Sequence, residues 1–77
     1  MNKTEFNIKF GAFVKTKREE LGLSQSQLAA RIGNNYQNIS RLERGEVSPT
    51  LYWCSLLAEA LEINLGLLVN QFIDNQS

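Results

Sequence analysis

The segment from Gln25 to Leu42 constrains the fold more than any other part of the sequence. Apolar residues recur there at helical spacing on both sides of a glycine. A small residue lets two helices approach each other, the glycine allows a tight turn, and branched side chains fill the wedge between the helices. The residues that meet these demands are Gln25, Leu28, Ala29, Ile32, Gly33, Ile39 and Leu42. The pattern predicts two short helices that cross steeply through a short turn.

Further amphipathic segments flank this pair. Ser24 and Gln27 form a capping-box pattern, Asn64 is a cap for a last helix, and either Ser48 or Thr50 caps the helix before it. Gly45 is suited to a helix C-terminus because it tolerates positive φ. No convincing strand pattern or internal repeat is present. We predict an all-α, five-helix single domain over residues 1–77, with helices at about 5–21, 25–32, 36–44, 50–61 and 65–73.

Composition excludes several classes of protein. The 77 residues suffice for one domain, and 43% hydrophobic with 21% charged residues is typical of a soluble globular chain. No apolar run approaches the roughly 18 residues of a membrane span, and no signal peptide is evident. A single cysteine, Cys54, and no histidine leave no disulfide or metal site, and we interpret the cysteine as a core residue. We expect a cytoplasmic protein without cofactors, catalytic residues or an evident small-molecule ligand, and therefore not an enzyme.

Charge is zero overall but is distributed unevenly. Residues 1–45 hold all eight basic residues against four acids, a balance of +4, whereas residues 46–77 hold four acids and no base. This asymmetry indicates that one end of the molecule is suited to an anionic partner and the other end to a different role.

Many separate positions resemble the Cro and lambda-repressor-like helix-turn-helix family. The resemblance covers about residues 10–69. Stand-alone regulators of this size in the family include small phage repressors and the controller proteins of restriction-modification systems, and the chain is similar to both. Asn34 departs from the family pattern, which usually has an apolar residue under the turn. The matching motifs are Lys17-Arg18, Leu21-Gly22-Leu23-Ser24-Gln25, Leu28-Ala29, Ile39-Ser40-Arg41-Leu42-Glu43-Arg44-Gly45-Glu46, Pro49-Thr50-Leu51, Leu57-Ala58 and Ala60-Leu61.

The resemblance implies a sequence-specific regulator of transcription that binds double-stranded DNA. Its third helix would lie in the major groove. Glutamine can pair with adenine, arginine with guanine, and a tyrosine ring can contact a thymine methyl. The implied base-reading residues are Tyr36, Gln37 and Arg41, with Asn35 and Asn38 at the margin. The implied phosphate-binding residues are Gln25, Arg44 and Lys17, and more weakly Ser24 and Ser40. Without this context, Tyr36, Gln37 and Arg41 would be interpreted as an ordinary solvated helix face.

Two further expectations concern structure and assembly. The resemblance implies an ion pair between Arg18 and Glu43 that ties the first helix to the third. The last two helices carry more apolar surface than a small domain buries, which favours a two-fold homodimer on an inverted-repeat operator, with half-sites about one helical turn (~34 Å) apart. We expect the interface to contain Trp53, Leu56, Ala60, Leu65, Leu68 and Phe72.

Two alternatives stay open. Trp53 could instead cover the core while the last helix folds back on its own chain. The fold could also serve mainly to hold another protein, as an interaction module or antitoxin. A bound regulator could either block polymerase or recruit it, and the sequence does not distinguish these outcomes.

Overall fold

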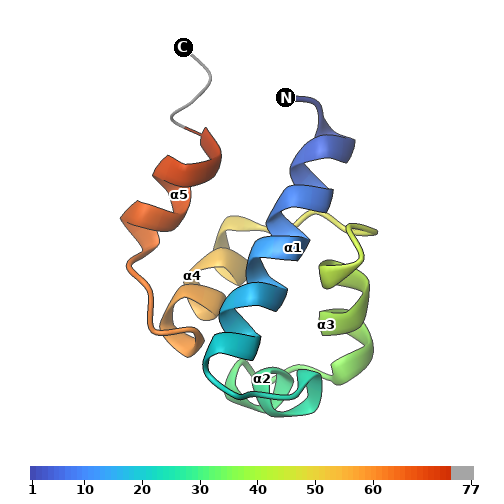
Figure 1. Ribbon diagram of the computed structural model, residues 1–77, viewed down its shortest axis with the longest axis vertical. Helices are drawn as coiled ribbons and strands as arrows, with labels where there is room; N and C mark the ends of the chain where they lie inside the picture. The colour runs from blue at the N-terminus through green and yellow to red at the C-terminus, as the bar shows by residue number, and fades with distance from the viewer. Residues whose placement is uncertain (74–77) are drawn as a thin grey trace.

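The computed structural model describes residues 1–73, with the backbone alone at Ile73. It contains α1 (Lys3–Glu20), α2 (Gln25–Arg31), α3 (Tyr36–Glu43), α4 (Leu51–Ala60) and α5 (Leu65–Ile73) (Figure 1). The predicted all-α, five-helix fold is confirmed, and no strand occurs within the described residues. Helix α1 begins two residues earlier than predicted, because the Asn2 side chain accepts a hydrogen bond from the Glu5 amide at 2.8 Å and caps the helix. None of the helices in residues 1–73 combines the length and apolar character needed to cross a bilayer.

Polar caps fix where α2 and α4 begin. The Gln27 amide donates to Ser24 Oγ at 3.0 Å, and the Ser24 amide donates to Gln27 Oε1 at 2.8 Å, so the predicted capping box is present. Thr50 rather than Ser48 caps α4, with its Oγ1 accepting from the Trp53 amide at 3.0 Å. Ser48 Oγ instead donates to Oδ1 of the buried Asn7 on α1 at 2.7 Å. This hydrogen bond ties the α3–α4 connection to α1.

Helix α3 ends in a left-handed turn. Gly45 has φ 77°, its amide donates to the Leu42 carbonyl at 3.0 Å, and the Glu46 amide donates to the Arg41 carbonyl at 3.0 Å. The turn after α4 has the same form, but Glu62 occupies the left-handed position with φ 61°. Glu62 is the only residue other than glycine with positive φ among those described.

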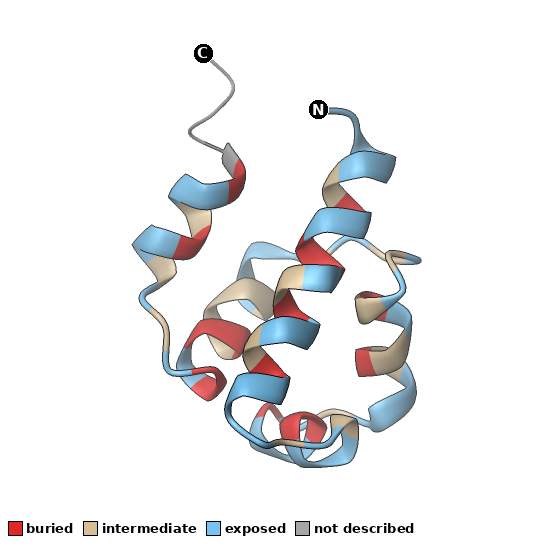
Figure 2. Ribbon diagram, in the orientation of Figure 1, coloured by how far each residue is buried: buried red, intermediate tan, exposed pale blue. Residues whose placement is uncertain are grey.

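Helix α1 lies between α3 and α5 (Figure 1) and packs against α3 through backbone. At Gly11, a Cβ atom would collide with the carbonyl oxygens of Leu42 and Glu43 at the end of α3. Along α1, buried residues recur between exposed ones at helical spacing (Figure 2). The buried apolar residues are Phe10, Val14, Leu28, Ala29, Ile32, Ile39, Leu42, Leu57, Ala58, Ala60, Leu61, Leu68 and Phe72.

Helix α5 folds back onto its own chain. Its Phe72 ring makes edge-to-face contacts with Phe6, Phe10 and Phe13 of α1, with ring centroids 5.9, 5.3 and 5.3 Å apart. These contacts bury Phe72 and, one turn earlier, Leu68. The arrangement of α5 matches the fold-back alternative.

Three residues expected at a dimer interface therefore belong to the core of a single chain. Ala60, Leu68 and Phe72 are only 7%, 3% and 8% exposed, because α4 and α5 pack against each other and against α1. Trp53, Leu56 and Leu65 are half-buried against the same core. Of the six residues expected at the interface, only Trp53, Leu56 and Leu65 retain surface that a partner could contact.

Candidate nucleic-acid interface

The exposed face of α3 is a shallow groove of about 430 Å³. The side chains that line it are Tyr36, Gln37, Ser40, Arg41 and Arg44. Three of them were expected to read bases and two to bind phosphate. The opposite face of α3 carries Ile39 and Leu42, whose exposure is 0%. One face thus anchors the helix in the core, while the other exposes hydrogen-bonding side chains at the surface.

Asparagines shape the start of α3. Asn35 Oδ1 accepts from the Asn38 amide at 3.0 Å and so caps the helix. Asn34 Oδ1 accepts from the Asn35 amide at 2.8 Å and from Asn38 Nδ2 at 2.7 Å. The residue that departs from the family pattern thus joins the turn to α3 by hydrogen bonds instead of apolar packing. Asn35 and Asn38, expected at the margin of base reading, also have this structural task.

A buried ion pair connects α1 to the end of α3. Arg18 Nε and Nη2 donate to the two carboxylate oxygens of Glu43 at 2.7 and 3.1 Å, while Nη1 donates to the Leu23 carbonyl at 2.6 Å. The side chains are 10% and 2% exposed. Hydrogen bonding to Glu43 raises the pKa of Arg18. All the Arg18 nitrogens are used within the protein, so this arginine offers little to an external anion.

Gln25 is the one predicted phosphate ligand that contacts this ion pair. Its Nε2 donates to Glu43 Oε1 at 3.0 Å. The side chain, at the start of α2, is therefore held against the end of α3 and oriented by a buried carboxylate. Ser24, the residue before it, uses its hydroxyl to cap α2.

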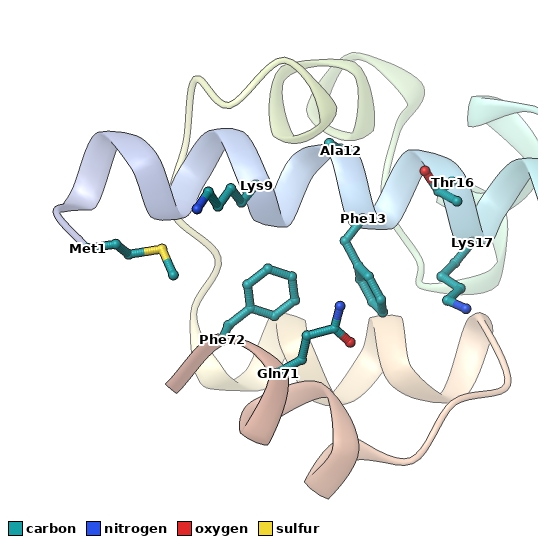
Figure 3. A pocket seen from close by; sticks show the side chains of 8 residues that line it. All are labelled: Met1, Lys9, Ala12, Phe13, Thr16, Lys17, Gln71 and Phe72. Atoms are coloured by element: carbon teal, nitrogen blue, oxygen red, sulfur yellow. The ribbon is translucent and has the colours of Figure 1, made fainter. Parts of the chain in front are cut away.

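Lys17 lies elsewhere. It lines a groove between α1 and α5 together with Lys9, Phe13, Gln71 and other residues (Figure 3). Its Nζ is 3.4 Å from Glu20 Oε1 and 5.6 Å from the centre of the Phe13 ring. Successive helical residues point about 100° apart, so the inward direction of Arg18 turns Lys17 toward α5. The structure does not bring Lys17 together with the α3 side chains.

Glu46 is a member of the α3 face that the sequence interpretation missed. Arg44 Nε and Nη2 donate to its two carboxylate oxygens at 2.7 and 3.2 Å, and Arg41 Nε lies 3.9 Å from Oε1. Arg44 Nη1 also donates to Ser40 Oγ. The hydrogen bond from Arg44 lowers the pKa of Glu46, and the same contact raises the pKa of Arg44. The available signal was an acid directly after the helix-ending Gly45.

Other reactive groups do not assemble into a site. Cys54 is half-buried beside the core, and burial raises the pKa of its thiol, which keeps it protonated at neutral pH. Among residues 1–73, no three histidine, cysteine, aspartate or glutamate side chains cluster in a way that could hold a metal ion.

The arrangement of α2 and α3, with their short turn and exposed second helix, is that of a helix-turn-helix unit, and comparison with known proteins agrees. Residues 14–68 match the helix-turn-helix family HTH_3. The chain belongs to this family.

One relative and two solved structures illustrate the similarity. An uncharacterized HTH-type transcriptional regulator of Methanothermobacter thermautotrophicus is 44% identical over 48 residues, 62% of this chain and 70% of the relative. The restriction-modification controller protein C.AhdI from Aeromonas hydrophila superposes with a TM-score of 0.81 and 31% identity, covering 88% of this chain and 99% of that protein. The clp gene regulator ClgR from C. glutamicum has a TM-score of 0.78 at 18% identity, covering 94% of each chain, and shares the fold.

Proposed function

We propose that the protein is a transcriptional regulator that binds double-stranded DNA in a sequence-specific manner through α3. The observation that carries the proposal is the division of α3 into two faces: Ile39 and Leu42 are fully buried, while the opposite groove gathers a tyrosine, a glutamine and two arginines. Side chains of these types can recognise base edges in the major groove. The regulator names of its relatives support the same conclusion.

Within this proposal the exposed residues divide into two roles. Gln37 pairs with adenine, Arg41 with guanine, and the Tyr36 ring, which is 53% exposed, contacts a thymine methyl. Arg44 and Gln25 bind phosphate, which fixes the register of α3 without reading sequence.

Exposed apolar side chains at the start of α4 support a homodimer. Leu51 and Tyr52 are 71% and 70% exposed, unusually high values for large apolar residues beside a folded core. Leu51 borders a small apolar pocket that α5 also lines through Val69. We propose a two-fold interface made of Leu51, Tyr52, Trp53, Leu56 and Leu65. Such a dimer would present two copies of α3 to an inverted repeat whose half-sites are about one helical turn (~34 Å) apart.

The test is selection of sequences from a random duplex library at physiological salt. We expect enrichment of an inverted repeat. Gln37→Ala should weaken binding to that repeat by about 1–3 kcal/mol and relax preference at one base pair, whereas Arg44→Ala should weaken binding to every duplex without changing the base preference and reduce the salt slope by about one. Gln71→Ala and Lys9→Ala, in the α1–α5 groove, are matched controls. They should change neither the base preference nor the salt slope.

Absence of enrichment would contradict the proposal. The exposed apolar residues Leu51 and Tyr52 would then favour an interaction module or antitoxin that uses this fold to bind another protein. Salt-insensitive DNA binding would point the same way, because phosphate contacts release counterions and make binding salt-dependent.

A further inference from the structure

An acidic side chain lies among the arginines of the α3 face. A carboxylate at this position repels DNA phosphate. The position of Glu46 is set by the backbone and not by a choice of side-chain rotamer. The left-handed Gly45 and the hydrogen bond from the Glu46 amide to the Arg41 carbonyl turn the chain back over the last turn of α3.

Neighbouring packing holds this turn in place. A Cβ atom at Gly45 would lie 2.9 Å from the Ile8 Cα and 3.1 Å from the Ile8 nitrogen, so α1 backbone lies against the turn. The Glu46 side chain itself remains about half exposed, at 48%. Its backbone is fixed while its carboxylate stays available to more than one partner.

The Glu46 carboxylate occupies the edge of Arg44 that a phosphate would use. Arginine binds carboxylate and phosphate through the same pair of parallel N–H groups. In Arg44 that pair, Nε and Nη2, donates to Glu46, and Nη1 donates to Ser40. Arg44 therefore cannot bind a phosphate through this edge without releasing Glu46. Arg41 Nε lies 3.9 Å from the same carboxylate and forms a longer ion pair with it.

We propose that Glu46 is a specificity-determining residue that competes with DNA phosphate for Arg44, and so weakens sequence-independent binding more than operator binding. The inference rests on the proposed function. On random DNA, phosphate contacts supply nearly all of the affinity, so the loss of Arg44 to Glu46 matters most there. On random DNA, α3 can take whichever register gives Arg44 the best phosphate contact. On the operator, base contacts from Gln37 and Tyr36 hold α3 in one register, so freeing Arg44 from Glu46 gains less affinity there.

The competing charge is present under ordinary conditions. The hydrogen bond from Arg44 holds the pKa of Glu46 below its usual range, so the carboxylate is ionised at neutral pH. Salt should weaken the competition, because both the carboxylate and the arginines are exposed and are screened at high ionic strength.

The experiment compares Glu46→Gln with the wild-type chain on the selected operator and on a random duplex, at several salt concentrations. Glutamine keeps the size of the side chain and removes its charge. We expect affinity for random DNA to rise about five- to tenfold at low salt and operator affinity to rise only about twofold, with a salt slope steeper by about one. Selectivity should fall accordingly.

Two controls separate a local effect from a change in net charge. Glu59→Gln removes one charge from the exposed surface of α4 and should leave the ratio of operator to random affinity unchanged. In an Arg44→Gln background, Glu46→Gln should have a much smaller effect, because the main object of competition is gone.

Each outcome is decisive. If Glu46→Gln lowers affinity for both duplexes, Glu46 orients Arg44 for binding and the inference is overturned. If it raises both affinities by the same factor as Glu59→Gln does, only net charge matters and the inference is again overturned. A wild-type chain that selects an operator while Glu46→Gln changes nothing would remove the inference alone, whereas a wild-type chain that binds no duplex would remove the proposed function with it.

Discussion

The α2–α3 unit and the α4–α5 pair are built from different interactions. Polar contacts join α2, α3 and the end of α1 through the Arg18–Glu43 ion pair and its hydrogen bond to Gln25, around fully buried Ile39 and Leu42. The α4–α5 pair lacks such a network among the described residues and is held to α1 mainly by aromatic and aliphatic packing. Directional contacts specify one geometry for α3, whereas apolar packing leaves open how much surface is shared with a partner.

The largest expected effect breaks the polar network. Glu43→Ala leaves the Arg18 guanidinium buried without its partner and removes the acceptor of Gln25, so we expect the free energy of unfolding to fall by about 3–5 kcal/mol. Urea denaturation measures this loss. The double variant Arg18→Met, Glu43→Leu removes both charges and should lose clearly less. Equal losses in the single and double variants would show that packing, not charge pairing, holds α1 to α3.

A charge at the start of α4 tests the other region. If the proposed two-fold dimer forms, Leu51→Glu should raise its dissociation constant at least tenfold, about 1.4 kcal/mol, because the two-fold axis would bring two like charges together. Light scattering at micromolar concentration measures the change. The stability of the monomer should change by less than about 0.5 kcal/mol, since Leu51 is 71% exposed.

Leu67 supplies the matched control for that interface. It is 68% exposed, and Leu67→Glu lies on the opposite side of α5 from Leu65. This variant should leave the dimer unchanged. A monomeric wild-type chain, or an equal response to both substitutions, would contradict the proposed interface.

The smallest effect concerns the turn between α4 and α5. Glu62 adopts φ 61°, a conformation that costs an L-residue with a Cβ atom more than it costs glycine. Glu62→Gly should therefore raise stability by about 0.5 kcal/mol, slightly reduced by loss of the exposed 3.7 Å pair with Arg31. Thermal denaturation measures this change in stability. Glu59→Gly, in the last turn of α4, should instead destabilise, and stabilisation by both would show that backbone conformation is not the cause.

Sequence reasoning succeeded where local chemistry decides the structure. The capping box of Ser24 and Gln27 and the helix-ending Gly45 depend on residues within a few positions, so their pattern predicts the helix boundaries. Ser48 and Thr50 could not be distinguished in the same way. Their roles depend on Asn7, which is distant in sequence and accepts the Ser48 hydroxyl.

The remaining differences have the same origin in tertiary contacts. Periodicity identifies Ala60, Leu68 and Phe72 as apolar but does not say whether α1 of the same chain or a partner covers them. Lys17 belongs to one of the matching family motifs, yet the direction of its side chain is fixed by the inward orientation of Arg18. Glu46 reaches Arg44 only because the chain reverses at Gly45.

The backbone contact at Gly11 bears on how the proposed dimer would accommodate different DNA targets. Because α1 meets the end of α3 without an intervening side chain, no compressible layer separates the two helices. The tilt of α3 relative to α1 is therefore fixed within the chain. In the proposed dimer, changes in the spacing between half-sites would have to be absorbed by bending of the duplex or by rotation of one subunit relative to the other. New target sequences, under the same proposal, would arise through substitutions on the exposed side of α3 alone.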